Sequence, residues 1–420
     1  MIVRLSSLLV CFTLLASLIA QQPNAASGDA GELVYVIYLS RHGVRSPTGK
    51  ASQYDRFSNA PWPSWNVKPA DLTPHGYELM RLFGQYHRSD LQSRGLFTPG
   101  CTDAARIKVY ADSDQRTAAT AKALVEGMFP NCTVSVEAKE EGVNDPLFHL
   151  PNNSITPQQA ALGAAAISGR IGDEPLALAQ AYKAQITELD HILATCGESQ
   201  KAHTRTSIFD VPVSIDPGTG DHIAAMRGPL NTSATLTENI LLEYTEGMPD
   251  KDVAWGCVDG IKLRHLIDLH TASSDLALRT PAIAVPQASA LLHTIDSSLA
   301  QAIAAKKVQG ALGKPNDKAL FLVGHDTNLT NIAGALDLNW LIDGRRDDTP
   351  PGSTLIFELW RNRDQYSVRV YFTAQTLEQM RNATPLTGNT KPPRVSVFVP
   401  GCSSPDASCE WPAFHRILNQ

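Results

Sequence analysis

Residues 39–47 have the sequence LSRHGVRSP and directly follow an apolar segment, residues 33–38, that is predicted to form a β-strand. In the loop after this strand, His42 lies between Arg41 and Arg45. The planar guanidinium group of arginine can bind two phosphate oxygens at once, and a neutral imidazole beside it can attack the phosphorus atom. This stretch therefore predicts a phosphate-binding site that contains a nucleophile.

Two other predicted strands also end in polar loops. Residues 106–112 alternate as a strand does and lead to Arg116, just before an alanine-rich helical segment. Residues 319–323 form a continuous apolar run, typical of a strand buried on both faces, and lead to His325 and Asp326. Because ligands of an open α/β sheet bind at the carboxyl ends of its strands, we expect the three loops to meet in one pocket.

The rest of the chain predicts an α/β fold with an insertion. Residues 354–360 and 366–372 are expected to form a β-hairpin at a sheet edge. Residues 151–304 are rich in alanine and leucine, which predicts a mostly helical subdomain. We expect it to interrupt a mixed sheet flanked by helices, formed by residues 27–150 and 305–420. Helical spacing is clearest in residues 175–193, 235–244 and 288–305.

The chain begins with a basic residue, Arg4, and an apolar run over residues 5–19, followed by small and polar residues. This order is typical of a secretory signal peptide, and we expect residues 1–26 to be removed by cleavage near residues 20–26. A membrane anchor is the alternative, but the run is short for a bilayer span. The mature protein is therefore expected to be periplasmic or secreted, without membrane attachment.

Six cysteines remain after the predicted cleavage, and an even number in an exported chain indicates three disulfide bonds. Sequence alone allows many pairings of six cysteines. We favour two pairs whose members are close in sequence, which leaves the third pair by elimination. The expected pairs are Cys101 with Cys132, Cys402 with Cys409, and Cys196 with Cys257.

The composition narrows the range of functions. The formal net charge is −6 and the isoelectric point is about 6.1, so the chain lacks the basic field typical of nucleic-acid-binding proteins. With 43% hydrophobic residues, the chain can bury a core large enough for two subdomains. We expect a monomer that acts on a small molecule and binds no nucleic acid.

The sequence resembles the histidine acid phosphatases, branch 2 of the histidine phosphatase superfamily. The Arg-His-Gly-x-Arg-x-Pro signature matches residues 41–47, and the distant His-Asp pair matches residues 325–326. The similarity covers nearly the whole mature chain and is greatest to the bacterial periplasmic phytases and glucose-1-phosphatases. It implies a phosphoglycerate-mutase-like α/β fold. Further matching segments are DLTPHG (residues 71–76), DPLF (145–148), GHDTNL (324–329) and TPPG (349–352).

The resemblance implies a role for each residue of the motifs. His42 would be the nucleophile that forms a phosphohistidine, and Asp326 would be the general acid that protonates the leaving alcohol. The phosphate oxygens would be held by Arg41, Arg45, Arg116 and His325. Several fixed cationic donors can stabilise phosphoryl transfer without a metal ion, so no metal or other cofactor is expected. Because Asp326 must be protonated to act, we expect activity to peak in acid.

Fewer residues bear on the choice of substrate. In this group the last proline of the signature, here Pro47, is often followed by Thr-Lys. The lysine of that segment helps to bind highly phosphorylated inositol. Here Gly49 takes the place of that lysine, and Lys50 is displaced by one position. Glu238 resembles a pocket-facing residue of the phytases, with an exposed helix carboxylate as an equal alternative. The candidate substrate-binding residues are Thr48, Lys50 and Glu238.

The leading hypothesis is an exported acid phosphatase that hydrolyses phosphomonoesters, with phytate as its main substrate. The alternative within the family is a glucose-1-phosphatase or a broad-specificity acid phosphatase. A non-catalytic protein that binds phosphate or inositol phosphates belongs to another class, but it would need neither His42 nor Asp326. A mutase is disfavoured by the secretion signal.

Several of these residues also have structural interpretations. Arg116 taken alone would be an ordinary solvated residue of a first helical turn. His325 and Asp326 could cap a helix, a role that is compatible with catalysis. His265 and His270 do not share a helix face, and we expect both to be non-catalytic.

Overall fold

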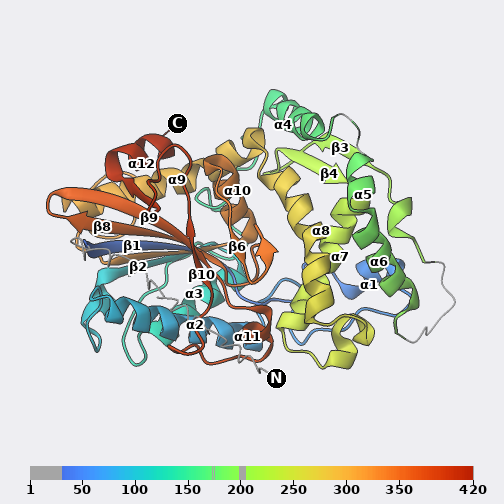
Figure 1. The fold of residues 1–420 in the computed structure, drawn as a ribbon, viewed down its shortest axis with the longest axis horizontal. Coiled ribbons are helices and arrows are strands. Elements are labelled where there is room, and N and C mark those ends of the chain that lie inside the picture. Colours follow the sequence, from blue (N-terminus) through green and yellow to red (C-terminus); the bar gives the residue numbers. More distant parts are fainter. Residues whose placement is uncertain (1–30, 173, 175, 198–204, 420) are drawn as a thin grey trace, which may run out of the picture.

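The computed structural model describes residues 31–172, 174, 176–197 and 205–419. They form two lobes side by side, one built around a large β-sheet and one mostly helical (Figure 1). The predicted signal peptide, residues 1–26, lies outside the described residues. None of the helices in this part of the chain combines the length and the apolar composition needed to cross a bilayer.

The large sheet is mixed, as the sequence predicted. Its strands are β1 (Glu32–Arg41), β2 (Ile107–Ala111), β5 (Ala319–Gly324), β8 (Thr354–Asn362), β9 (Gln365–Thr373), β10 (Arg394–Val397) and β11 (Ser408–Glu410). The order is β10-β9-β8-β1-β5-β2, and β11 also pairs with β9. β1, β5 and β2 are parallel, whereas β8 to β11 pair with their neighbours in antiparallel fashion. The expected strands at 33–38, 106–112 and 319–323 are confirmed.

The β8–β9 hairpin does not lie at a sheet edge, so that expectation is wrong. β8 pairs with β1 on one side, and β9 is covered by both β10 and β11 on the other. These two covering strands have only four and three residues. Strands this short carry too little alternation for a sequence pattern to reveal them.

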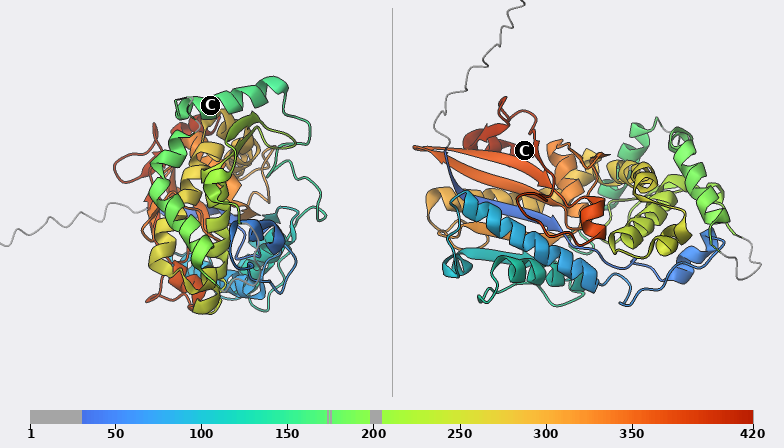
Figure 2. Two further views of the ribbon diagram at one scale, coloured as in Figure 1. Left: turned by 90° about the vertical axis from the view of Figure 1, so that its right-hand side faces the viewer. Right: turned by 60° about the horizontal axis from the view of Figure 1, so that its bottom comes forward.

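Helices cover both faces of the sheet, as the right-hand view of Figure 2 shows. On one face, α2 (Pro74–Ser93) and α3 (Gln115–Met128) pack against side chains that include Val36 and Tyr38. On the other face, α9 (Pro281–Ala304), α10 (Asp326–Leu336) and α12 (Trp411–Leu418) pack against residues that include Ile37 and Leu39. Burial on both faces explains the continuous apolar runs in the central strands.

The helical lobe is built around α7 (Pro229–Thr245), which is buried along most of its length. The other helices of this lobe are α4 (Pro157–Arg170), α5 (Ala177–Ala181), α6 (Lys183–Thr195) and α8 (Gly260–Leu278). A small hairpin, β3 (Ser214–Pro217) and β4 (Ala224–Arg227), packs beside α4. Short elements complete the fold: α1 (Ala51–Tyr54), α11 (Leu377–Arg381), β6 (Leu341–Ile342), β7 (Arg345–Arg346), and the 3-10 turns η1 (Asp55–Phe57), η2 (Thr102–Arg106), η3 (Ile208–Asp210) and η4 (Asp250–Gly256).

The packing of the lobes departs from the expected division at residues 150 and 304. α9, which falls within the expected 151–304 insertion, packs on the sheet through residues such as Leu291 and Ile295. In the opposite sense, Phe57 and Trp62 of the first core segment belong to the hydrophobic cluster of the helical lobe. A helical spacing reports that a face is buried but not which partner buries it, so the sequence could not place these segments.

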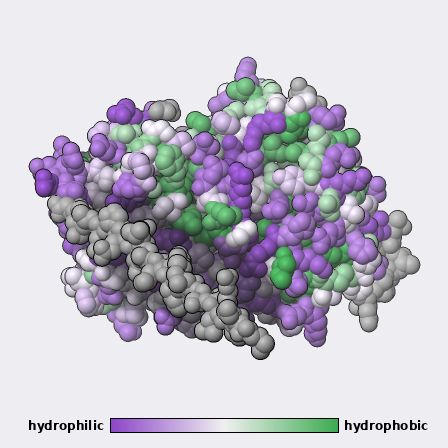
Figure 3. All heavy atoms as spheres, viewed as in Figure 1, coloured by the Kyte–Doolittle hydropathy of each residue, from purple (hydrophilic) through white to green (hydrophobic). Residues whose placement is uncertain are grey.

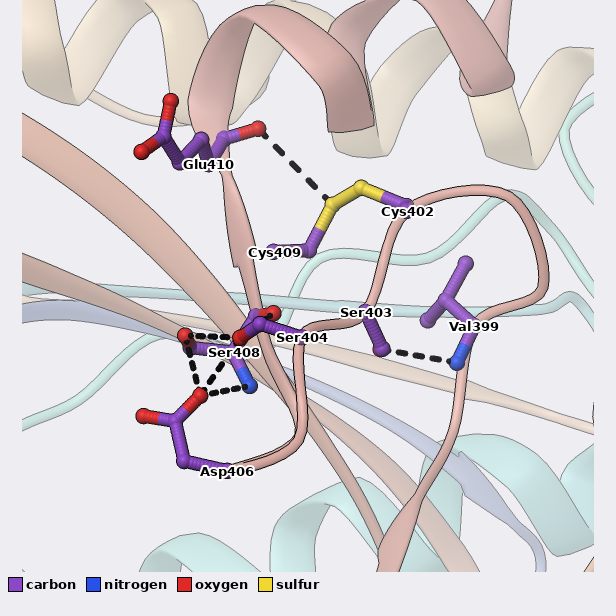
Figure 4. The surroundings of a disulfide bond; sticks show 8 residues. All are labelled: Val399, Cys402, Ser403, Ser404, Asp406, Ser408, Cys409 and Glu410. Carbon is purple, nitrogen blue, oxygen red and sulfur yellow. Dashed lines mark hydrogen bonds between the residues drawn. A yellow bond between two sulfur atoms is a disulfide. The ribbon is translucent and has the colours of Figure 1, made fainter.

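All three expected disulfides are present. Cys101 is bonded to Cys132, Cys196 to Cys257, and Cys402 to Cys409. The second bond joins the end of α6 to η4, far apart in sequence. Around the third, Asp406 accepts hydrogen bonds from the hydroxyls of Ser404 and Ser408 within the loop that the disulfide closes (Figure 4).

Hydrophilic residues predominate on the face shown in Figure 3, and hydrophobic residues occur there in scattered groups. The exposed large hydrophobic side chains of the described residues are spread over both lobes, from Val143 and Leu162 to Leu341 and Phe398. Scattered residues of this kind are normal on a protein surface. They give no reason to place the functional site on an apolar surface.

Candidate active site

The carboxyl ends of β1, β5 and β2 lie together at one edge of the sheet. In the parallel register, Arg41 is opposite Gly324, and Ala111 is opposite Val323. The backbone N–H of His42 donates to the carbonyl of Gly324 at 2.9 Å. The pairing of the strands thus brings together three loops that are far apart in sequence, as expected.

The loop after β1 is held closely against α2. Thr73 caps this helix by accepting a hydrogen bond from the N–H of Gly76 at 2.8 Å, and its own N–H donates to the carbonyl of Val44 at 3.1 Å. A Cβ atom at Gly76 would lie 2.0 Å from the carbonyl oxygen of Val44. Only glycine therefore permits this approach.

The loop after β5 is fixed by a helix cap. His325 is the N-cap residue of α10, which begins at Asp326. The side-chain carbonyl of Asn328 accepts from the N–H of His325 at 2.9 Å, and its amide donates to the carbonyl of Phe148 at 2.7 Å. The capping interpretation and the place of this pair in the site are therefore compatible, because the cap sets the position of both side chains.

A cavity of about 310 Å³ lies at this edge of the sheet. Its walls include six of the predicted residues: His42, Arg45, Thr48, Arg116, His325 and Asp326. Arg41 is fully buried, and its Nη2 lies 3.5 Å from Oδ2 of Asp326. Lys50 instead lines a neighbouring cavity, together with Trp62 and Trp65. The structure thus groups the predicted residues but leaves Lys50 apart.

His42 presents an unprotonated Nε2 atom. Its Nδ1 lies 2.9 Å from the carbonyl oxygen of Gly43, and because a carbonyl only accepts, Nδ1 carries the proton of the neutral ring. Burial, followed by the charges of Arg41 and Arg45, holds the pKa of His42 well below its usual value. The ring is therefore neutral in acid, with the lone pair of Nε2 available for attack.

Each of the three arginines has a buried hydrogen-bond donor that is unpaired within the described residues. Within the described residues, the Nε atoms of Arg41, Arg45 and Arg116 are buried and have no hydrogen-bond partner. Other donors are in use: Nη1 of Arg41 donates to the carbonyl of Thr349 at 2.5 Å, and Nη1 of Arg45 to that of Ser46 at 2.9 Å. Buried donors normally have partners, and an oxyanion with several acceptor oxygens would supply them.

Two carboxylates lie beside the arginines. Glu238 of α7 forms a buried ion pair with Arg41, and its Oε1 is 3.7 Å from Nη2 of Arg45. Burial alone would raise the pKa of Asp326, but the charges of Arg41, His270 and Arg45 outweigh it and hold that pKa well below its usual range. Asp326 is therefore ionised in the ligand-free protein even in acid.

A buried carboxylate, Asp112, accepts from two histidines. Its Oδ2 is 2.5 Å from Nε2 of His325 and 2.8 Å from Nε2 of His149. On the other side of its ring, Nδ1 of His325 is 3.3 Å from Nη2 of Arg116, which can only donate. His325 therefore has one donating and one accepting nitrogen and is neutral. Burial, which holds its pKa below the usual value, agrees with this.

The same three residues offer ligand atoms within 4.8 Å of one another, close enough to hold a metal ion. A metal on Nε2 of His325 would leave the proton of the ring on Nδ1, where it would face the guanidinium of Arg116. Two donors would then oppose each other. Asp112, His149 and His325 thus fit a hydrogen-bonded network better than a metal centre.

The sequence analysis did not include Asp112, His149 or His270 among the site residues. A signal existed for Asp112, because it ends a predicted strand at the functional edge of the sheet. Nε2 of His270 lies 3.7 Å from Oε2 of Glu238, so this histidine, which we expected to be non-catalytic, lies beside the site carboxylates. This contact depends on how α8 packs against α7, which no local pattern reports.

Comparisons with known proteins agree with this arrangement. The family model described as histidine phosphatase superfamily (branch 2) matches residues 32–210 and 222–373. Phytase AppA of Escherichia coli (strain K12) is 33% identical over 420 residues, covering 97% of this chain and 96% of that protein. A glucose-1-phosphatase of Salmonella typhimurium is 29% identical and covers 92% of each chain.

Solved structures show the same likeness. Hafnia alvei phytase in complex with myo-inositol hexakis sulphate has a TM-score of 0.84 and 33% identity, covering 94% of this chain and 98% of that one. The phytase from Citrobacter braakii has a TM-score of 0.82 and 33% identity, covering 92% and 97%. The mixed sheet and the helical lobe are thus shared with these proteins over nearly their whole length.

Proposed function

The chain belongs to branch 2 of the histidine phosphatase superfamily, and we propose that it hydrolyses phosphomonoesters through a phosphohistidine on His42, with phytate as its leading substrate. One observation carries the proposal. The free Nε2 of His42 shares a cavity with Arg45 and Arg116, and the buried Nε–H groups of these two arginines and of the adjacent Arg41 lack partners among the described residues. A phosphoryl group would satisfy these donors and present its phosphorus atom to the nucleophile.

In the first step, a bond forms between Nε2 of His42 and phosphorus while the bond from phosphorus to the leaving oxygen breaks. The arginines stabilise the charge on the equatorial oxygens. The leaving oxygen takes the proton of Asp326. Because Asp326 is ionised in the ligand-free protein, we expect the negative substrate to offset the charge of Arg41 and Arg45 and so to raise the pKa of Asp326 on binding.

In the second step, water attacks the phosphorus atom, and the carboxylate of Asp326 takes the proton of that water. The bond between phosphorus and His42 breaks, which restores the neutral ring and releases inorganic phosphate. The neutral His325 is held by Asp112 and Arg116 next to the reacting group. We propose that it positions Arg116 and contributes a polar surface rather than a positive charge.

The relatives support phytate as the substrate class, since the similar proteins named above include several phytases. Glucose 1-phosphate is the second candidate, because glucose-1-phosphatases are similar over the same length. Thr48 and Glu238 lie close enough to the cavity to take part in substrate binding, whereas Lys50 would act only from its neighbouring cavity. We also propose export to the periplasm or beyond, which the three disulfides support.

The test is phosphate release by the mature, disulfide-bonded protein in acid, with and without EDTA. The substrates are phytate, glucose 1-phosphate and p-nitrophenyl phosphate, and the control is His42→Ala. EDTA-resistant release that is fastest from phytate and is lost in the control is the expected result. Faster release from glucose 1-phosphate would make that ester the assigned substrate and leave the proposed mechanism unchanged. A folded protein that binds phytate but releases no phosphate from any of the three would instead be a binding protein.

A further inference from the structure

One wall of the cavity has no part in the mechanism above. It includes His149, Asp221, His222 and Gln287. Asp221 and His222 are at the tip of the β3–β4 hairpin, and Nε2 of Gln287 on α9 donates to the backbone carbonyl of Asp221 at 2.8 Å. This wall therefore joins elements of both lobes around the space next to the phosphate-binding residues.

His149 is held firmly in this wall. Its Nε2 donates to the buried Asp112 at 2.8 Å, and its backbone N–H donates to the carbonyl of Asp145 at 2.9 Å. The His149 ring centre is 5.3 Å from that of His325, which in turn is 5.6 Å from that of His42. With 28% of its side chain exposed, His149 can reach a ligand whose first phosphate is bound at His42.

The Nδ1 atom of His149 is the one left for a ligand. Its partner within the described residues is Oδ2 of Asp221 at 3.5 Å, an ion-pair distance rather than a good hydrogen bond. An anion that enters this part of the cavity would compete with Asp221 for the Nδ1–H group. A histidine N–H group, a competing carboxylate and open space for a ligand therefore lie together in this part of the cavity.

The groups around His149 favour its charged form. The hydrogen bond to Asp112 raises the pKa of His149, and the charges of Asp221 and Asp114 act in the same direction, while burial opposes them. The other charged and titratable groups that face it are the neutral His325, Arg116 and the exposed His222. In acid, where the mechanism operates, His149 is thus an imidazolium.

We propose that protonated His149 binds a second phosphate group of a polyphosphorylated substrate, and that Asp221 opposes this contact. The inference rests on the proposed function, because it concerns substrates that carry several phosphates. It makes His149 a specificity residue: it distinguishes polyanions from single phosphate esters. It also predicts that this preference weakens as the pH rises and His149 loses its proton.

The experiment uses sulfate compounds, whose charge does not change in the relevant pH range. Inhibition of p-nitrophenyl phosphate hydrolysis by the mature protein is measured with inorganic sulfate and, separately, with myo-inositol hexakis sulphate. The readout is the ratio of the two inhibition constants at pH 5 and at pH 8. For the native protein, we expect the preference for the hexakis sulphate to be about tenfold larger at pH 5, since one charge-assisted contact is at stake.

Three variants decide the outcome. His149→Asn should lose most of the preference at pH 5 and most of its pH dependence. Asp221→Asn should increase the preference, because the competing carboxylate is gone. His265→Asn is the matched control. His265 on α8 is half-exposed and its Nε2 also lies 3.5 Å from a carboxylate oxygen, that of Glu188, but it is not among the residues that line the cavity, so this variant should leave the ratio unchanged.

A purely structural role of His149, acting through Asp112 and His325, would weaken both inhibitors alike and leave the ratio unchanged. That result, or an equal loss in His265→Asn, overturns the proposal. The proposed function is tested by a separate measurement, the hydrolysis of phytate. If the protein hydrolyses p-nitrophenyl phosphate but not phytate, phytate is wrong as the substrate, while the inhibition ratio still tests His149.

Discussion

Arg41 and Glu238, which are 197 positions apart in sequence, form a buried ion pair that joins the two lobes at the active site. Arg41 ends β1 of the sheet lobe, and Glu238 lies on α7, the central helix of the helical lobe. The pair also lies within 3.5 Å of Asp326, measured from Nη2 of Arg41. The attachment of the lobes and, in the proposed mechanism, the binding of phosphate therefore depend on the same guanidinium group.

Replacing Glu238 by glutamine should destabilise the protein and perturb the phosphate site. We expect the free energy of unfolding to fall by roughly 1–3 kcal/mol, because the variant loses the negative charge that pairs with the fully buried Arg41. Urea unfolding at pH 7 measures this. The matched control is Glu78→Gln, whose partner Arg81 is about one-third exposed and whose loss should cost less than about 1 kcal/mol. Equal losses in the two variants would contradict the prediction.

Asp326→Asn should reveal whether this residue donates a proton. An alkoxide leaves poorly without protonation, whereas p-nitrophenolate leaves readily. We therefore expect the first step, release of the alcohol, to slow by about 10² to 10⁴ for phytate or glycerol phosphate and far less for p-nitrophenyl phosphate. Rapid-mixing measurements of the first turnover give this rate separately from the later release of phosphate, in which Asp326 acts as the base for both substrates. If alcohol release slows by the same factor for both substrates, Asp326 does not act as the acid.

His87 on α2 should limit the stability of the protein in acid. Its ring is buried between Tyr38 and Phe83, with ring centres 4.7 and 4.3 Å away, and burial lowers its pKa to about 3. In the unfolded chain His87 binds a proton near pH 6.5, whereas in the folded protein it stays neutral until the pH is near 3. The free energy of unfolding therefore falls as the pH decreases from about 6.5 towards 3. Between pH 7.5 and 4.5, we expect the native protein to lose roughly 2–3 kcal/mol more than His87→Phe. Urea unfolding at both values tests this, and parallel losses would show that another group is responsible.

The site residues that could be predicted from sequence are those whose position depends on local pattern. His42, His325 and Asp326 each follow a strand that the sequence marks clearly, and the parallel register of β1 and β5 then brings them together. Arg116 needed a third strand, which alternation also revealed. The functional edge of the sheet could thus be located because strand ends are properties of short segments.

The remaining features depend on long-range packing. His270 meets Glu238 only because α8 packs against α7. We expected α9 in the helical subdomain, but it buries Leu291 against the sheet. Lys50 follows Thr48 by two residues, yet the chain turns so that Lys50 lines the neighbouring cavity. No spacing rule carries such information, because it is set by how whole elements pack.

Glu243 on α7 should make stability fall as the pH rises. Its side chain is buried, and burial raises its pKa to about 8, although its Oε2 accepts a hydrogen bond from the N–H of Ala254 at 2.8 Å. The folded protein therefore holds a proton that the unfolded chain loses near pH 4.5. The stabilising contribution is complete below pH 4.5 and is lost as the pH rises towards 8.

Glu243→Gln removes this titration and keeps an acceptor for Ala254. From pH 5 to pH 8, we expect the native protein to lose roughly 3–4 kcal/mol relative to the variant, measured by urea unfolding. At pH 5 the two proteins should be nearly equal, because folded Glu243 is then as neutral as glutamine, and this comparison is the internal control. A variant that is less stable by the same amount at both pH values would mean that Glu243 is ionised in the fold. The turn at Ala254, with its φ of 44°, would then be stabilised by a charged hydrogen bond instead.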